Sequence, residues 1–286
     1  MKILLTGANG YLGRYVKTVL NDSELEYVTL SHIELKQWNP KQITDFLKEN
    51  AVTDIIHLSA AVGNMSLDEI FESNVIMLYN LLQGCKEGNI KHFVFASSNN
   101  VYSSYKDQSS CETDACDPIY SNAYGISKYI GECLIEDFCK HCNMGYSIVR
   151  IADIYGPKQK TGNLMKALVR SIALGESLKL YGEGTRKRDY IYVTDAAQGM
   201  LHICKNRIDG KINLGTGIAT SVKELVDIAC RVSGNKCGIE RISVTDEDKS
   251  SIYLNVDKLK KSGFYPRIMI EQGMRLCVEE EMKCRD

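Results

Sequence analysis

The chain has 286 residues, of which 44% are hydrophobic and 25% charged, and its formal net charge at pH 7 is −1. This is the composition of an ordinary globular protein with a sizeable core, and no apolar run approaches the ~18 residues of a membrane span. The near-neutral charge gives no electrostatic case for nucleic acid or a membrane surface as a partner.

The first thirteen residues predict a strand, a tight turn and a helix. Apolar residues 3–5 lead into the stretch TGANGYLG at 6–13, and residues 14–20 continue in a helical register. Gly7 suits a sharp turn, Gly10 allows a diphosphate to approach the backbone, and Gly13 allows close packing of the helix on the strand. The helix start offers free N–H groups and a positive dipole to phosphate. Because the glycines lie between a strand and a helix, they predict a dinucleotide site rather than a chance repeat.

Strands and helices then alternate as far as residue 151. The expected strands are 27–30, 54–58, 92–96 and 145–151, and the expected helices are 41–48, 67–86 and 123–141. Each strand is a nearly continuous apolar run, which is typical of a parallel sheet buried on both faces. The sequence therefore predicts an α/β fold with a doubly wound, Rossmann-type parallel sheet and a smaller C-terminal substrate-binding portion.

The pattern changes after Gly156. The expected elements are a helix at 164–174, a glycine-rich turn at 181–184, a strand at 190–193, a helix at 195–204, a strand at 211–214 and a helix at 221–232. The last helix has Ser221 and Glu224 at the positions of a capping box. We expect residues 1–155 to form the dinucleotide-binding domain, with 189–216 returning to it, and residues 156–188 and 217–286 to form the substrate-binding portion.

The eleven cysteines do not predict a metal site or a disulfide framework. Cys139 and Cys142 form one isolated pair, with no second pair at zinc-finger spacing, and the total is odd. The start of the chain leads straight into a strand without the pattern of a secretory signal. We therefore expect a cytoplasmic protein whose thiols are reduced and pack as small hydrophobic groups.

Tyr124 and Lys128 are candidates for acid/base chemistry. They lie four residues apart on an expected helix, so they share one face. A phenol with its free pKa of ~10 is a poor base, and a neighbouring cation favours the phenolate. This spacing is commonplace on exposed helices and is weak evidence by itself. It becomes evidence of a catalytic site together with Ser98, which is expected just after the fourth strand, because parallel sheets present functional groups at the carboxyl ends of their strands. These three residues predict proton exchange with a substrate oxygen while a nicotinamide moves hydride.

With these motifs in place, the chain resembles the extended short-chain dehydrogenases/reductases of the nucleotide-sugar epimerase and dehydratase superfamily. The resemblance covers nearly the whole chain. Its stretches are TGANGYLG (6–13), HLSAA (57–61), SNV (73–75), FASSNNVY (95–102), YGISK (124–128), RIADIYGP (150–157), RDYIYVTDAA (188–197) and INLGTG (212–217).

The resemblance implies roles for individual residues. Tyr124 would be the acid/base, Lys128 would bind the nicotinamide ribose and lower the pKa of Tyr124, and Ser98 would hydrogen-bond the reacting oxygen. The residues expected at an NAD or NADP cofactor are Thr6, Gly7, Asn9, Gly10, Tyr11, Leu12, Gly13, Ser31, His32, Leu58, Ala60, Ala61, Asn74 and Lys128. Those expected at the substrate are Asn99, Asn100, Asp153 and Arg188, and Arg188 either meets a diphosphate bidentately or belongs to a solvated basic turn.

The chain departs from the family pattern in three places. Ser31, followed by His32, stands where NAD-preferring relatives carry an acid for the ribose hydroxyls, so NADP becomes an alternative. Asn99 and Asn100 replace the Asp-Glu pair of dehydratases, and amides cannot ionise to support 4,6-dehydration. Asp153 replaces the usual asparagine of R-x-x-N-x-Y-G-P, so either its carboxylate points away from a diphosphate or the substrate is unusual.

The function predicted is that of an NAD(P)-dependent oxidoreductase acting at C4 of a nucleotide sugar, either a 4-epimerase or a 4-ketoreductase. The alternatives are a reductase of a non-sugar carbonyl and a non-catalytic NAD(P)-sensing protein. The resemblance also implies a homodimer formed through helices of the first domain, including the Tyr124 helix.

Overall fold

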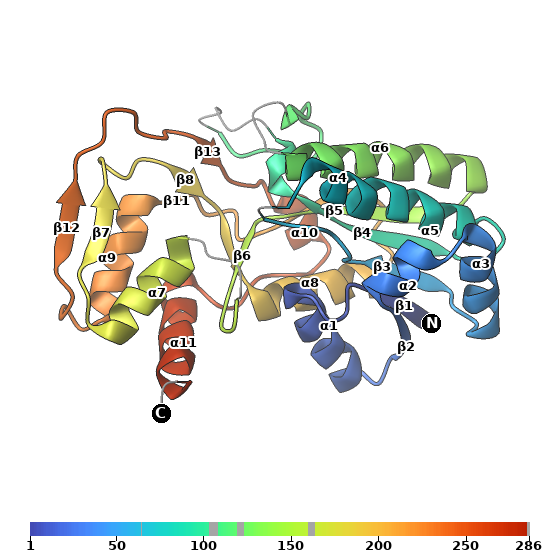
Figure 1. Ribbon diagram of the computed structural model, residues 1–286, viewed down its shortest axis with the longest axis horizontal. Helices are drawn as coiled ribbons and strands as arrows, with labels where there is room; N and C mark the ends of the chain where they lie inside the picture. The colour runs from blue at the N-terminus through green and yellow to red at the C-terminus, as the bar shows by residue number, and fades with distance from the viewer. Residues whose placement is uncertain (64, 103–107, 119–122, 160–163, 285–286) are drawn as a thin grey trace.

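The computed structural model describes residues 1–63, 65–102, 108–118, 123–159 and 164–284 (Figure 1). Its strands are β1 (Lys2–Thr6), β2 (Glu26–Leu30), β3 (Asp54–His57), β4 (His92–Ser98), β5 (Gly145–Ile151), β6 (Asp153–Tyr155), β7 (Leu178–Tyr181), β8 (Lys187–Arg188), β9 (Tyr190–Tyr192), β10 (Gly210–Leu214), β11 (Thr220–Ser221), β12 (Ile239–Ile242) and β13 (Ser251–Ile252). Its helices are α1 (Tyr11–Asp22), α2 (His32–Gln37), α3 (Pro40–Glu49), α4 (Leu67–Phe71), the π-helical η1 (Glu72–Ile76), α5 (Met77–Cys85), the 3₁₀ turn η2 (Asn99–Val101), α6 (Ala123–Cys142), α7 (Leu164–Leu174), α8 (Val193–Lys205), α9 (Val222–Val232), α10 (Asp257–Lys261) and α11 (Ile270–Lys283).

The central sheet has six parallel strands in the order β10-β5-β4-β3-β1-β2. All of β3 and β4 is buried, as expected for central strands covered on both faces. The predicted Rossmann-type α/β fold is confirmed. Ser98 is the last residue of β4 rather than the residue that follows it, because β4 continues in register with β5 as far as Ile151.

Helices cover both faces of this sheet (Figure 1). Neighbouring strand residues point to opposite faces, so Leu5 packs in a core with the helices α1 and α8, while Leu4 packs in a second core with α3, α5 and α6. Both leucines are fully buried, which stabilises the fold by roughly 1.5–3 kcal/mol for each side chain. The two cores fix the sheet from both sides and hold the carboxyl ends of its strands in place.

A third core lies in the C-terminal part of the chain, at the left of Figure 1. There β7 and β12 pair in parallel beside the helices α7, α9 and α11. The predicted capping box of α9 is present, since the Ser221 side chain accepts a bond from the Glu224 N–H and the Glu224 carboxylate accepts one from the Ser221 N–H. Among the described helices, none combines the length and the apolar character needed to cross a bilayer.

Candidate active site

The turn after β1 has a geometry that only glycine fits. Gly7 has a φ of +69°, and a Cβ there would lie 2.7 Å from the backbone carbon of Leu58. A Cβ on Gly13 would overlap the carbonyl oxygen of Gly7. The Gly10 N–H donates to the same oxygen at 2.9 Å, which closes the turn. This packing brings the start of α1 against the end of β1.

A cavity of about 590 Å³ opens beside this turn. It is lined by residues 7–10, 29–34 and 58–62, together with Met65 and Ser73. Gly10 is the N-cap of α1 and has no side-chain cap bond, so first-turn N–H groups remain available to a phosphate. Of the residues expected at the cofactor, Gly7, Asn9, Gly10, Ser31, His32, Leu58, Ala60 and Ala61 line this cavity. The turn, the free helix start and the cavity fit the adenosine diphosphate half of a dinucleotide.

Thr6, Tyr11 and Leu12, which were also expected at the cofactor, are not among the residues that line this cavity. The Thr6 hydroxyl is hydrogen-bonded to Nδ1 of His57 at 2.8 Å, and Leu12 packs against the core that holds Leu5. The Tyr11 hydroxyl is buried beside Gly156 without a hydrogen-bond partner among the described residues. Thr6 and Leu12 thus support the turn from within the protein.

The lining of this cavity contains a carboxylate that the sequence-based prediction did not single out. Ser31 is the N-cap of α2; its N–H donates to Oε2 of Glu34 at 2.7 Å, and its hydroxyl accepts from the Glu34 N–H at 3.2 Å. Hydrogen bonds that the Glu34 carboxylate accepts from the hydroxyl and the N–H of Ser31 lower the pKa of Glu34 below its usual value. The capping-box signature Ser-x-x-Glu at 31–34 is the signal that identifies this residue. An ionised carboxylate is therefore fixed in the lining of the cavity.

Asn74 connects the cofactor side of the site to the helix of Tyr124. The predicted helix over 67–86 is interrupted by η1, and Asn74 lies in that π-helical turn, a feature common at functional sites. Its Oδ1 accepts from the Ala61 N–H at 2.7 Å, and its Nδ2 donates to Oγ of Ser127 at 2.9 Å. The Ser127 hydroxyl in turn donates to the carbonyl of Tyr124 at 2.7 Å. Asn74 is thus a structural link between the loop at Ala61 and α6.

The structure brings Ser98, Tyr124 and Lys128 together at the end of β4 and the start of α6. Tyr124 shares a hydrogen bond with Ser98, and the Lys128 ammonium lies 5.7 Å from the centre of the Tyr124 ring. Burial raises the pKa of Tyr124 to about 12; the bond to Ser98 lowers the pKa and Asp153 raises it. The lowering by Lys128 that the resemblance implied is not among these causes. The phenol is therefore protonated at neutral pH.

Lys128 is buried at 2% exposure and its ammonium donates to the carbonyl of Ala96 at 2.8 Å. Burial lowers the pKa of Lys128 to about 7, while the nearby Glu132 carboxylate acts to raise it. Glu132 also accepts a bond of 2.7 Å from Arg150, and both of these side chains are 1% exposed. A buried charge network therefore lies behind the candidate catalytic lysine.

The three polar residues expected at the substrate beside Arg188 continue from Ser98 through hydrogen bonds. The Ser98 hydroxyl donates to Oδ1 of Asn99 at 3.2 Å, and the Asn99 Nδ2 donates to Oδ1 of Asp153 at 3.1 Å. The Asn100 N–H donates to Oγ of Ser98 at 3.1 Å. Asp153 therefore points toward the catalytic candidates. Burial raises its pKa, while Asn99, Arg188 and Arg186 lower it.

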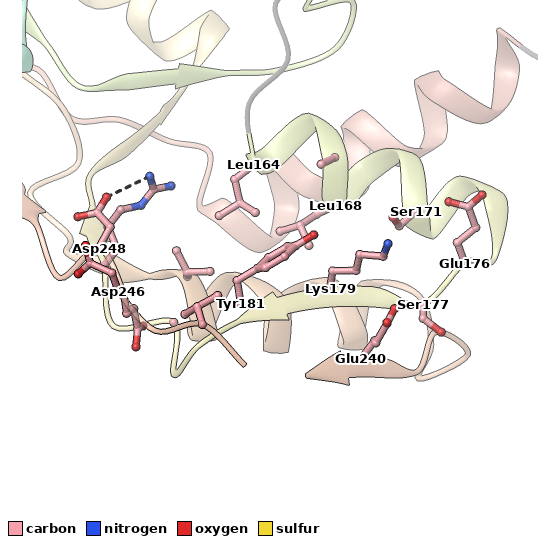
Figure 2. Close-up of a pocket in the computed structure, with 16 residues that line it drawn as sticks. Leu164, Leu168, Ser171, Glu176, Ser177, Lys179, Tyr181, Glu240, Asp246 and Asp248 are labelled. Carbon is pink, nitrogen blue, oxygen red and sulfur yellow. Dashed lines mark ion pairs between the residues drawn. The ribbon is translucent and has the colours of Figure 1, made fainter. Parts of the chain in front are cut away.

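A second cavity, of about 690 Å³, lies in the C-terminal part between α7 and β7 (Figure 2). Arg186 lines it and is ion-paired with Asp248 at 3.6 Å. The neighbouring Arg188 donates to the carbonyl and the hydroxyl of Ser250, and its pKa is lowered by burial. The ring of Tyr181, on β7, points into the same cavity.

Comparison with known proteins gives the family. The model of the NAD dependent epimerase/dehydratase family matches residues 3–215. The chain belongs to this family.

The similarity extends over almost the whole chain. The UDP-glucose 4-epimerase of Caenorhabditis elegans is 30% identical over 88% of this chain and 89% of that protein. A structure of UDP-glucose 4-epimerase from Thermotoga maritima with UDP-glucose has a TM-score of 0.87 at 23% identity, covering 100% of both chains. MoeE5 in complex with UDP-glucose and NAD has a TM-score of 0.86 at 25% identity, again over 100% of both chains. The predicted superfamily is confirmed, and the chain is an NAD-dependent enzyme of the epimerase/reductase type.

Proposed function

We propose that this enzyme is a 4-epimerase of a nucleotide sugar. The observation that carries the proposal is the cluster of Ser98, Tyr124 and Lys128 beside the cofactor cavity, with Arg188 on the substrate side. The UDP-glucose 4-epimerases among its relatives favour epimerisation over the alternative, a 4-ketoreductase. Asn99 and Asn100 supply no carboxylic acid for dehydration.

The residues of this chain would act on the proton of the C4 oxygen. The phenol of Tyr124 must first lose its own proton; as the phenolate it takes the C4 hydroxyl proton during oxidation and returns it during reduction, while Ser98 holds the same oxygen through a hydrogen bond. Lys128 lies beside the phenol and binds the ribose of the cofactor. When bound, NAD supplies the acceptor and donor of hydride. Asn74 keeps the loop at Ala61 and the Tyr124 helix in a fixed relation.

We further propose that the cavity in Figure 2 receives the nucleotide portion of the substrate. Arg186 and Arg188 supply the charge for a diphosphate. Two of the nearby carboxylates are already engaged within the protein: Asp248 by Arg186, and Glu247 by the N–H groups of Glu183 and Thr185 at 3.1 and 2.9 Å. The exposed ring of Tyr181 offers an apolar surface to a base.

We propose that Glu34 is the residue that binds the adenosine ribose hydroxyls and disfavours the 2′-phosphate of NADP. The Ser31 N–H holds its carboxylate in the cavity lining, and two negative groups there would repel each other. Replacing Glu34→Gln should weaken NAD binding and reduce the preference for NAD over NADP about tenfold or more. Calorimetric titration with both cofactors measures this ratio, and an unchanged ratio would contradict the proposal.

We also propose that a second copy of the chain covers one face of the helices beside the site. Exposed apolar side chains gather there from α4, η1, α5 and α6, namely Leu67, Phe71, Ile76, Tyr79 and Ile126. The helices α4 and α5 both contact α6. Analytical ultracentrifugation should give a dimer for the parent chain and a monomer for Tyr79→Asp; a parent monomer at micromolar concentration would refute this.

The proposed reaction can be tested with purified protein, NAD and a panel of UDP-, dTDP- and GDP-sugars. Proton NMR should show interconversion of one pair of C4 epimers without net reduction of NAD. Tyr124→Phe should lower kcat by about 10²–10⁴-fold while NAD binding is retained. Full activity in Tyr124→Phe, or consumption of reduced cofactor with a keto sugar instead of epimerisation, would reject the 4-epimerase mechanism.

A further inference from the structure

The first half of α6, which carries Tyr124 and Lys128, rests on the sheet through small and polar residues. Its buried members up to residue 132 are Gly125, Ser127, Lys128, Gly131 and Glu132, and the next buried residue is Ile135. A Cβ on Gly131 would lie 2.8 Å from Cζ of Phe95, so the helix approaches β4 closely there. Apolar packing is non-directional, and the buried face of this half offers little of it. Directional hydrogen bonds are therefore expected to contribute strongly to the position of the two candidate catalytic side chains.

Two side chains one turn apart on α6 bond to two neighbouring residues of β4. The Lys128 ammonium donates to the carbonyl of Ala96 at 2.8 Å, and Oε1 of Glu132 accepts from the Ser97 hydroxyl at 2.5 Å. Arg150 lies opposite Ser97 in the register of β4 and β5, and it donates to the Glu132 carboxylate from Nε at 3.0 Å and from Nη2 at 2.7 Å. This is the bidentate geometry in which a guanidinium binds a carboxylate. Arg150 thus holds the helix from the neighbouring strand.

The same guanidinium also holds a loop that precedes α6 in the chain. Nη2 of Arg150 donates to Sγ of Cys116 at 2.9 Å, and Nη1 donates to the carbonyl of Glu112 at 3.4 Å. Its Cζ lies 4.7 Å from the centre of the Tyr102 ring, and Tyr102 forms an antiparallel bridge with Cys116. Arg150 is 1% exposed. One buried side chain therefore contacts both the helix that carries Tyr124 and the loop at 112–116.

We propose that Arg150 is a positioning residue that aligns Tyr124 and Lys128 with the reacting oxygen and the cofactor. The proposal rests on the proposed roles of these two residues in the reaction. Arg150 acts through Glu132, which lies four residues beyond Lys128 on the same helix, and through the loop at 112–116. The planar fork of arginine reaches the carboxylate, the thiol and the carbonyl together, whereas lysine offers one nitrogen and cannot reproduce these contacts. A displacement of about 1 Å in a catalytic group can cost about 10²-fold in rate.

Arg150→Lys tests the proposal because it keeps the positive charge and removes the fork. In the epimerase assay it should lower kcat by about tenfold or more and change KM for the sugar nucleotide by less than about twofold, because the proposed nucleotide cavity belongs to other elements. The matched control is Arg207→Lys. Arg207 makes the same two-pronged contact with Asp54, at 2.9 and 3.0 Å, but at the amino end of β3, away from the site. Its kcat should stay within about twofold of the parent value. Equal kcat values in the two variants, or a loss in Arg150→Lys that lies in KM alone, would overturn the proposal.

Hydrogen exchange followed by mass spectrometry gives a readout that does not depend on turnover. In Arg150→Lys, peptides covering residues 123–132 should exchange about tenfold faster, whereas peptides from β1 and β2 should keep the parent rate. Equal acceleration in both regions would indicate a general loss of stability and would count against positioning. Lack of activity in the parent enzyme on the whole sugar panel would reject the proposed function, whereas the exchange rates would still decide whether Arg150 holds the helix.

A double variant keeps the test decisive if Arg150→Lys does not fold. Glu132→Leu with Arg150→Met removes both charges and retains apolar volume, a change that often preserves stability. It also removes every side-chain bond from position 150 to the helix and the loop. Once thermal denaturation shows that this variant is folded, its kcat should still lie about tenfold or more below that of the parent. A parent-like kcat in the folded double variant would overturn the proposal.

Discussion

Replacing Glu132→Gln should strongly destabilise the enzyme. Glu132 and Arg150 are each 1% exposed, and the carboxylate accepts bonds from Arg150 at 2.7 and 3.0 Å and from Ser97 at 2.5 Å. Glutamine keeps the shape but leaves the guanidinium buried without a counter-charge, and its amide group turns a donor toward other donors. Removing one partner of such a pair costs about 3–5 kcal/mol in the free energy of unfolding.

The loss can be measured by urea denaturation followed by the fluorescence of Trp38. This is the single tryptophan of the chain, and it packs against the core that holds Leu4. The matched control is Glu271→Gln, which breaks half-exposed pairs with Arg231 and Arg275 and should cost at most about 1 kcal/mol. A loss for the buried variant no larger than that of this control would refute the reasoning.

A double variant separates the lost charge pair from lost packing. Glu132→Leu combined with Arg150→Met removes both charges and keeps apolar volume, and such replacements are often neutral or stabilising. Its free energy of unfolding should exceed that of Glu132→Gln. If the double variant is the less stable of the two, the uncompensated charge is not the cause.

Three more outcomes follow from the site. Gly13→Ala should lower both stability and NAD affinity, because the added methyl overlaps the carbonyl of Gly7; thermal denaturation with and without NAD tests this, and parent-like values would contradict it. The pKa of Lys128 is about 7 in the folded state and 10.5 for the free side chain. Between these pH values the unfolded chain binds more protons than the folded one, so the free energy of unfolding should rise with pH by up to about 1.4 kcal/mol per pH unit. Lys128→Met should show a flatter profile in urea denaturation at pH 7–9, and parallel profiles would exclude the depressed pKa. Asn74→Leu should weaken NAD binding by roughly tenfold or more, because it removes the hydrogen bond that holds the loop at Ala61. Calorimetry measures the Kd for NAD, and an unchanged Kd would contradict this role of Asn74.

Much of the fold follows from local sequence. The run at 145–151 is strand β5 with the predicted bounds, because its apolar residues are buried in the sheet. The glycine turn was equally predictable, since Gly7 and Gly13 have contacts that no other residue tolerates. The π-helical turn at Asn74 could not be predicted. Apolar residues at helical spacing indicate a helix, but they do not show where a turn contains one extra residue. In this turn the Asn74 side chain bonds to Ala61, thirteen positions away in the sequence.

The parts of the site that escaped prediction depend on contacts between distant or unexpected residues. Glu34 lies in the lining of the cavity beside the glycine turn, where a capping box with Ser31 holds it, and a search for an acid at the end of β2 overlooks it. The direction in which Asp153 points is set by pairing of β6 with β9, which joins residues almost forty positions apart. Burial of Lys128 likewise depends on the whole packing of α6 against β4. Sequence identifies the chemical groups of this site, whereas their protonation depends on tertiary contacts.

The place of α8 and β10 has a consequence for synthesis on the ribosome. Strand β10 pairs with β5 at one edge of the central sheet, and α8 covers the face on which Ile3, Leu5 and Val94 lie. Helix α1 covers part of that face early, but the part beneath α8 stays uncovered until this helix, which ends at Lys205, has left the exit tunnel. Exposed apolar strands in a nascent chain are prone to aggregate. The order of elements along the chain thus leaves part of an apolar sheet face exposed until most of this enzyme has been synthesised.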